Sequence, residues 1–167
     1  KASETAALMV THDSEEAMFM SDNIVVLRNG QVQQTGRPVN LYCQPNSAFV
    51  AEFFGEVNQL EGIVANGTIQ TVLGVFEAPE DCVEGKQVQI VIRYEALFIE
   101  PDSTGANAEV MEARLLGRAS LIHLSVPTGT NALHLHARVP GLNSLQSGSK
   151  VRITVDPSQA FVFPSPA

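Results

Sequence analysis

Residues 85–101 and 148–164 carry the same pattern at a constant offset. Each copy begins with a glycine, continues with alternating β-branched residues and closes with a proline, so that Gly85 matches Gly148 and Pro101 matches Pro164. Such alternation is typical of a half-buried strand, and glycine is typical of the turn before it. Two units of this kind indicate that both feed strands into a common barrel or sandwich. The alternative is two unrelated hairpins with similar turn residues.

The residues around these two copies also favour strands. A further hairpin is predicted from strands over 121–126 and 132–139, joined by the turn residues 127–131. The small polar residues 102–107 are typical of a linker between the two halves. Residues 55–167 are therefore predicted to form one β domain.

The first 54 residues have a different character. Residues 6–10 form a continuous apolar run, which is typical of a strand buried on both faces of a parallel sheet. Acidic residues follow at the start of a helix predicted over 14–20, where the helix dipole favours negative charge. Because a parallel strand needs neighbours and nothing precedes this one, we expect the natural protein to be longer than this chain.

The remainder of this region is predicted to hold a hairpin and two short helices. A hairpin is predicted over residues 23–35, because Asn29-Gly30 lies there between apolar residues and this pair is a strong hairpin signal. Pro38 is predicted to open one helix and Asn46 to cap another. We place the domain boundary after Phe54.

Charge excludes several classes of partner. Ten Lys and Arg against 18 Asp and Glu give a formal net charge of −8. An acidic chain without a basic stripe argues against nucleic-acid binding and against docking on anionic lipid. The two cysteines, Cys43 and Cys82, match no metal-binding spacing and are interpreted as reduced thiols.

Several strings together resemble a known family. Met9–Ala17, with its Thr-His-Asp and acidic helix start, resembles the switch-histidine loop of ATP-binding-cassette (ABC) ATPases. The segments 21–32 and 34–58 are similar to the hairpin and connector of importer subunits for ferric iron, polyamines and sugars. The rest resembles the transport-associated oligonucleotide-binding-like (TOBE) domain, whose usual V-R-P-E is Ile92-Arg93-Tyr94-Glu95 here.

The resemblance implies a mainly β fold. It implies an OB-like Greek-key β-barrel of the TOBE or molybdate-binding (MOP) type over 55–167, preceded by an α/β remnant of an ABC ATPase domain over 1–54. It also implies the C-terminal part of an ATP-hydrolysing importer subunit that forms a homodimer. Its further partners would be transmembrane permease subunits and, indirectly, a solute-binding protein, which places it in the cytoplasm on the inner face of the membrane.

The nucleotide site of such a subunit is largely missing from this sequence. The chain contains no G-x-x-x-x-G-K-[ST] phosphate loop, signature sequence or Walker-B strand. These parts would cradle the phosphates of ATP and hold Mg²⁺. We therefore expect the full-length protein to use ATP and Mg²⁺, and this chain alone to bind no cofactor and to be inactive.

His12 is the candidate catalytic residue. A lone histidine after an apolar strand is usually structural, but the Thr-His-Asp context favours function. The resemblance implies that the imidazole contacts the γ-phosphate of ATP and the attacking water in the full-length protein. Thr11 and Asp13 are predicted to fix the loop and cap the helix.

Five residues of the β domain are candidate regulatory or interface residues. Arg93 and Glu95 are interpreted either as a surface ion pair or as a contact that tethers the barrel to the ATPase domain. The alternation predicts that His123, His134 and His136 point outward from one face of a hairpin. They could form a metal site, a pH-sensitive patch or a dimer surface, or have no role beyond surface polarity; no metal site is assigned.

The resemblance implies that solute specificity resides in a binding protein and a membrane channel, which are not part of this sequence. The string from Phe53 to Asn58 favours the ferric-iron group, with polyamine or phosphonate importers as alternatives. Two further functions are kept open, namely a barrel that binds small oxyanions and a purely structural dimerisation module.

Overall fold

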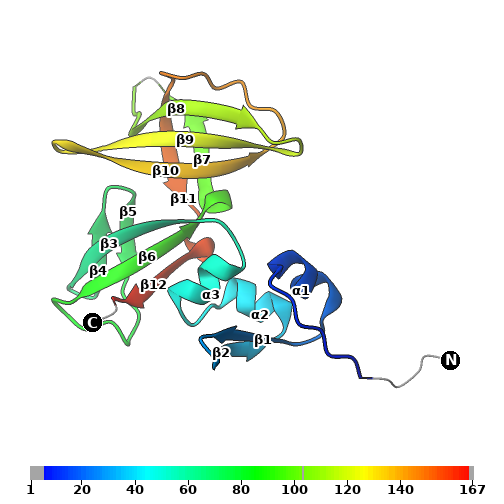
Figure 1. Ribbon diagram of the computed structural model, residues 1–167. Helices are drawn as coiled ribbons and strands as arrows, with labels where there is room; N and C mark the ends of the chain where they lie inside the picture. The colour runs from blue at the N-terminus through cyan, green and yellow to red at the C-terminus, as the bar shows by residue number, and fades with distance from the viewer. Residues whose placement is uncertain (1–5, 103, 166–167) are drawn as a thin grey trace. The chain divides into compact units, whose positions relative to one another are not determined.

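The computed structural model describes residues 6–102 and 104–165, which form two compact units, Lys1–Phe54 and Gly55–Ala167 (Figure 1). The predicted linker 102–107 includes residue 103, which lies outside the described residues. Each unit has its own buried core.

Over residues 6–54, the first unit contains three short helices and one hairpin. Its elements are α1 (Ser14–Met20), β1 (Ile24–Arg28), β2 (Gln31–Gly36), α2 (Pro38–Cys43) and α3 (Ala48–Phe53). The hairpin turns at Asn29 and Gly30, whose φ values of 53° and 76° are those of the tight turn that Asn-Gly favours. A small core forms from Ala17, Ile24, Val26, Leu41, Val50 and Phe54. The predicted hairpin and helices are thereby confirmed.

Two details of this unit differ from the prediction. Residues 6–10 are not a strand: Leu8 and Val10 are 94% and 92% exposed. A strand forms only where its backbone finds a partner, and no described residue supplies one. The cap of α3 is Ser47, whose hydroxyl accepts from the Val50 N–H, whereas Asn46 donates to the Gln33 carbonyl.

The second unit consists almost entirely of strands, which confirms the mainly β, OB-like prediction. Among its described residues, two 3₁₀ turns interrupt the strands, η1 (Tyr94–Ala96) and η2 (Pro157–Gln159). Its strands are β3 (Val57–Ala65), β4 (Thr68–Thr71), β5 (Gly74–Glu77), β6 (Gln87–Arg93), β7 (Leu97–Pro101), β8 (Ala108–Leu115), β9 (Ala119–Thr128), β10 (Asn131–Pro140), β11 (Lys150–Val155) and β12 (Ala160–Pro164).

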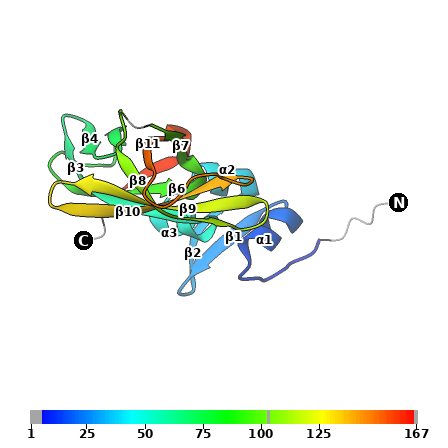
Figure 2. The ribbon, with the colours of Figure 1, turned by 90° about the horizontal axis from the view of Figure 1, so that it is seen from above.

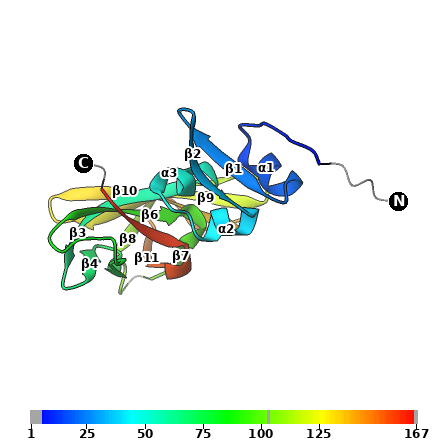
Figure 3. The ribbon, with the colours of Figure 1, turned by 90° about the horizontal axis from the view of Figure 1, so that it is seen from below.

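The sequence repeat coincides with a structural one. The strand, 3₁₀ turn and strand of β6-η1-β7 recur as β11-η2-β12. The two sheets have the orders β12-β6-β3-β4-β5 and β7-β11-β8-β9-β10, so each half lends its last strand to the other half's sheet. From below, β12 lies beside β6 (Figure 3), and from above β9 lies beside β10 (Figure 2).

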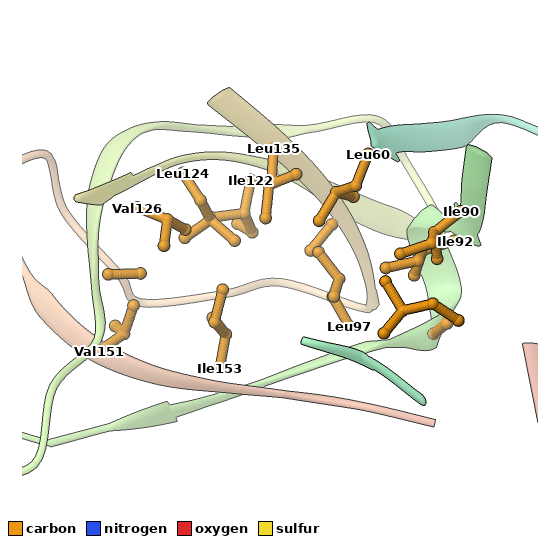
Figure 4. Close-up of a cluster of buried hydrophobic side chains, with 14 of the residues drawn as sticks. Leu60, Ile90, Ile92, Leu97, Ile122, Leu124, Val126, Leu135, Val151 and Ile153 are labelled. Atoms are coloured by element: carbon orange, nitrogen blue, oxygen red, sulfur yellow. The ribbon is translucent and has the colours of Figure 1, made fainter. Parts of the chain in front are cut away.

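One hydrophobic core serves both sheets. Figure 4 shows the side chains of Ile90 and Ile92 from β6 facing those of β9, β10 and β11. Ile90 and its repeat counterpart Ile153 are both buried, so the two copies supply equivalent core positions. Because the last strands are exchanged, neither half completes its sheet alone. This agrees with the prediction that residues 55–167 form one β domain.

Candidate functional site

The loop before α1 is held by a small hydrogen-bond network. The Thr11 hydroxyl donates to the Glu16 carboxylate at 2.6 Å and accepts from the Asp13 N–H at 3.1 Å. The Asp13 carboxylate accepts from the Glu16 N–H at 2.9 Å and so caps the helix. The roles predicted for Thr11 and Asp13 are confirmed.

His12 lies between these two anchored residues and is exposed. The network that shapes the loop does not use its imidazole. The side chain is thus presented to solvent from a fixed backbone. That arrangement suits a histidine that acts on a group bound outside the described residues.

In the second unit, the three predicted histidines lie on the outer face of the β9–β10 hairpin. Ile122, Leu124 and Leu135 are buried on the inner face. His123 and His136 are paired across the two strands, and their rings lie 4.5 Å apart in an edge-to-face arrangement. The outward orientation is confirmed.

These histidines do not form a metal centre in the described part of the chain. No group of three or more His, Cys, Asp or Glu side chains there is placed to hold a metal ion. His134 is exposed, whereas His123 and His136 are half-buried. The three residues therefore differ in environment although their spacing looks uniform.

The second ring contact of His136 comes from η1. Tyr94 stacks on His136 with 5.1 Å between ring centroids and an interplanar angle of 28°. Burial raises the pKa of the Tyr94 phenol, with the Glu56 carboxylate acting in the same direction, so this ring stays neutral at physiological pH. The residue that replaces the usual proline of V-R-P-E is thus a packing partner of the histidine pair.

The backbone of His136 is held by a residue far away in the sequence. The buried Asn58 side chain donates to the His136 carbonyl and accepts from the His136 N–H, both at 2.8 Å. An amide side chain can do this because it carries one donor group and one acceptor like a peptide. Asn58 therefore takes the place of a neighbouring strand at the edge of β10.

Arg138 adds a charged contact to the same region. Its guanidinium pairs with Glu56, and its Nε lies 4.0 Å from Glu95. Arg93 is fully buried, with its guanidinium 5.6 Å from the centre of the Phe161 ring. Arg93 is therefore not a surface residue, whereas Glu95 lies beside Arg138. The alternative role of Arg93 and Glu95, a contact that tethers the barrel to the ATPase domain, stays a prediction.

The environment of His136 lowers its pKa. Burial is the largest cause, because a protonated imidazole loses hydration there, and His123 acts in the same direction. Glu56 opposes this shift, and His134 makes a smaller lowering contribution. These surroundings accordingly favour the neutral form of His136.

Sequence reasoning identified the histidines but missed three residues that hold them. Asn58, Glu56 and Arg138 are brought to the hairpin only by the fold. The sequence offered one signal, the tyrosine at position 94 where the family motif has proline. That substitution does not indicate a contact with β10.

Comparison with known families fits this arrangement of strands. Residues 90–163 match the family described as the TOBE domain. This chain carries a TOBE domain. The matched residues include most of each copy of the sequence repeat and the whole β9–β10 hairpin, so the candidate histidines lie within the matched segment.

Relatives with established names extend the similarity beyond the TOBE domain. The spermidine/putrescine import ATP-binding protein PotA of Acetivibrio thermocellus is 36% identical over 155 residues, covering 89% of this chain and 41% of that protein. The sulfate/thiosulfate import ATP-binding protein CysA 1 of Chromobacterium violaceum is 34% identical over 163 residues, covering 93% and 45%. The Fe(3+) ions import ATP-binding protein FbpC of Fusobacterium nucleatum is 33% identical over 162 residues, covering 95% and 39%.

These relatives confirm the resemblance to ABC-importer ATP-binding subunits with a TOBE domain. The chain spans about two fifths of the length of the curated relatives it matches. They divide among polyamine, sulfate and ferric-iron import in their names, and none of these solutes is singled out.

A solved structure supports the fold independently. The cytoplasmic molybdate-binding protein ModG, with molybdate bound, superposes with a TM-score of 0.50 at 15% sequence identity, covering 65% of this chain and 96% of ModG. Similarity at this level shows the common fold of the TOBE domain and ModG. Within the described residues, no helix has the length and apolar character needed to cross a bilayer.

Proposed function

We propose that this chain is the C-terminal part of the ATP-hydrolysing subunit of an ABC importer, with His12 as its switch histidine. Support comes from the named relatives, which match most of this chain. The exposed His12 on its anchored loop is the single structural observation that carries the catalytic part.

In the full-length subunit, bound ATP would supply the phosphoryl group that water attacks, and Mg²⁺ would neutralise charge on the phosphates. This chain contributes His12, whose imidazole would donate a hydrogen bond to the γ-phosphate and help orient the water. Thr11 and Asp13 hold the backbone on either side, so the imidazole starts from a defined position. The residues that bind the other phosphates and Mg²⁺ would belong to the rest of the subunit.

The test is His12→Ala in the full-length protein. ATP turnover is expected to be abolished while nucleotide binding is largely kept, because the imidazole acts on the phosphate rather than on the base. His134→Ala, which removes another exposed imidazole, is the matched control and should leave turnover unchanged. Near-normal turnover in His12→Ala would refute the assignment.

We further propose that the chain by itself neither binds nor hydrolyses ATP with useful affinity. It lacks the sequence motifs that cradle phosphate and hold Mg²⁺. Calorimetric titration of the chain with Mg·ATP should give no heat of binding, and saturable binding would contradict the proposal.

The TOBE domain is proposed to stabilise the homodimer or to regulate turnover. The subunit would act in the cytoplasm against transmembrane permease subunits, with a solute-binding protein as an indirect partner. Deleting residues 56–167 from the full-length protein distinguishes the two roles. Loss of the dimer favours dimerisation, whereas loss of control over the ATPase rate in an intact dimer favours regulation.

Ferric iron remains the proposed solute, on the basis of the string from Phe53 to Asn58. Polyamines and sulfate are the competing solutes, because relatives at 36% and 34% identity carry those names. Uptake of labelled ferric iron, spermidine and sulfate by a deletion strain decides among them. Loss of spermidine or sulfate uptake alone would overturn the iron proposal.

Oxyanion binding is the alternative that the ModG fold suggests. ModG is described with molybdate bound. Equilibrium dialysis of this chain with molybdate, tungstate and sulfate tests this second function, and retention of any of them would favour it.

A further inference from the structure

Strand β10 lies at the edge of its sheet, with β9 on one side. On its other side, Asn58 makes two hydrogen bonds to the backbone of His136. Arg138, two residues later, pairs with Glu56 just before β3. The edge of this ten-residue strand that faces away from β9 is thus held at the start of β3, through residues 136 and 138.

His136 is the centre of that fastening. Its backbone is held by Asn58 and its ring lies between Tyr94 and His123. The Tyr94 N–H in turn donates to the Glu56 carbonyl at 3.0 Å, which ties η1 to the same end of β3. His136 therefore contacts η1 and β9 through its ring and β3 through its backbone, so a change at this residue bears on all three elements.

Titratable and charged groups surround this ring on every element packed against it. His134 and Arg138 flank it on β10, and His123 faces it from β9. Tyr94 and Glu95 lie on η1, and Glu56 precedes β3. Glu112 of β8 is paired with His123 on the far side. Glu56 is the carboxylate that favours a positive charge on His136, while burial and the other imidazoles oppose it.

We propose that His136 is a pH-sensitive fastening for strand β10: the neutral ring fits between Tyr94 and His123, and protonation loosens the strand from β3 and η1. The half-buried ring would carry a charge there next to a second imidazole at 4.5 Å. A charge on the half-buried His136 ring loses hydration that its neighbours replace only in part.

The direction of the effect follows from linkage. A histidine whose pKa is lowered on folding binds fewer protons in the folded than in the open state. Its contribution to closure is complete above its ordinary pKa of about 6.5 and is lost as pH falls from there through the lowered value. Acidification therefore weakens the fastening, and neutral pH restores it.

Amide hydrogen exchange of this chain tests the proposal. The reporter is the His136 N–H, which Asn58 holds. After correction for intrinsic exchange, its protection should fall about threefold or more between pH 7.5 and 5.5 relative to amides of β11. An unchanged protection ratio would overturn the proposal.

Two matched variants identify the group responsible. His136→Phe keeps an aromatic ring between Tyr94 and His123 but cannot be protonated, so the pH dependence should disappear. His134→Phe removes a neighbouring exposed imidazole of the same strand and should retain the pH dependence. The proposal fails if His136→Phe retains it or if His134→Phe abolishes it.

A measurement on the unaltered chain covers the case in which a variant does not fold. In a proton NMR titration, the C2 proton of His136 should report a midpoint below about 6.5. The ring protons of Tyr94 should shift with the same midpoint, because the two rings are stacked. A Tyr94 signal that stays constant while His136 titrates would contradict the fastening.

Discussion

In the second unit, the first half, β3 to β7, and the second half, β8 to β12, place corresponding strands in the same order in their two sheets. Their edge strands differ, because β5 has four residues and β10 has ten. β5 borders an open groove lined by residues that include Phe76, Val155 and Pro157. β10 is fastened by Asn58, by Tyr94 and by the ion pair of its own Arg138 with Glu56.

The two halves also differ in the residue that precedes the 3₁₀ turn. In the first half it is the buried Arg93, and at the equivalent position of the second half it is Asp156. Asp156 caps η2 by accepting from the Ser158 N–H, whereas η1 has no side-chain cap. The comparison teaches that the repeat preserves the core and the strand order, while edges and turns diverge. The candidate regulatory site occurs where the two halves differ.

The largest effect is expected from truncating side chains of the core that the two halves share. Ile90→Ala and Ile153→Ala remove equivalent buried side chains, so each should lower the free energy of unfolding by about 2–5 kcal/mol. Urea unfolding followed by circular dichroism measures both. A large cost at one position only, or separate unfolding of the two halves, would break the equivalence.

A glycine of β3 provides the next test of close packing. A Cβ at Gly62 would lie 2.2 Å from Cγ2 of the buried Ile69, so Gly62→Ala should cost about 1–3 kcal/mol through overpacking. Gly36→Ala is the control, since its Cβ would meet nothing closer than 3.8 Å. Equal thermal stability of the two variants would show that β3 is looser than this contact implies.

Two asparagines that hold strand backbones should differ in importance. Asn58 binds the His136 backbone and Asn107 binds the Ile153 backbone, each through two hydrogen bonds. Asn58→Ala should cost about 1–2 kcal/mol because a buried backbone pair loses its partner. Asn107→Ala should cost less, because that side chain is half-buried and water can replace it. A greater cost for Asn107→Ala in the same unfolding assay would reverse the comparison.

The smallest expected effect is the pH dependence of the cap on η2. Hydrogen bonds from the Ser158 hydroxyl and N–H lower the pKa of Asp156. Its contribution is therefore present above about pH 4 and is lost as pH falls through the lowered value. Asp156→Ala should cost ~0.5 kcal/mol at pH 7 and nothing once the wild-type carboxyl is protonated. A variant that remains equally destabilised at pH 2 would show that packing, not charge, is responsible.

Local patterns were sufficient for most elements. Asn29-Gly30 predicts its own hairpin because the turn needs positive φ values that these residues adopt at low cost. The alternation around His123 and His136 predicts that both point outward, because successive side chains of a strand face opposite sides. The strand predicted over residues 6–10 is wrong. An apolar pattern indicates that a segment can be buried as a strand, but it does not show that another strand is there to pair with it.

By itself, the sequence determined the repeat, the mainly β character, the outward histidines and the Thr-His-Asp loop, since each depends on neighbouring residues or on a fixed periodicity. Only the tertiary structure decided that the last strands are exchanged between the halves and that Asn58 meets His136 across 78 positions. Such contacts depend on which strands pair, and pairing is settled by burying one shared core rather than by any local pattern.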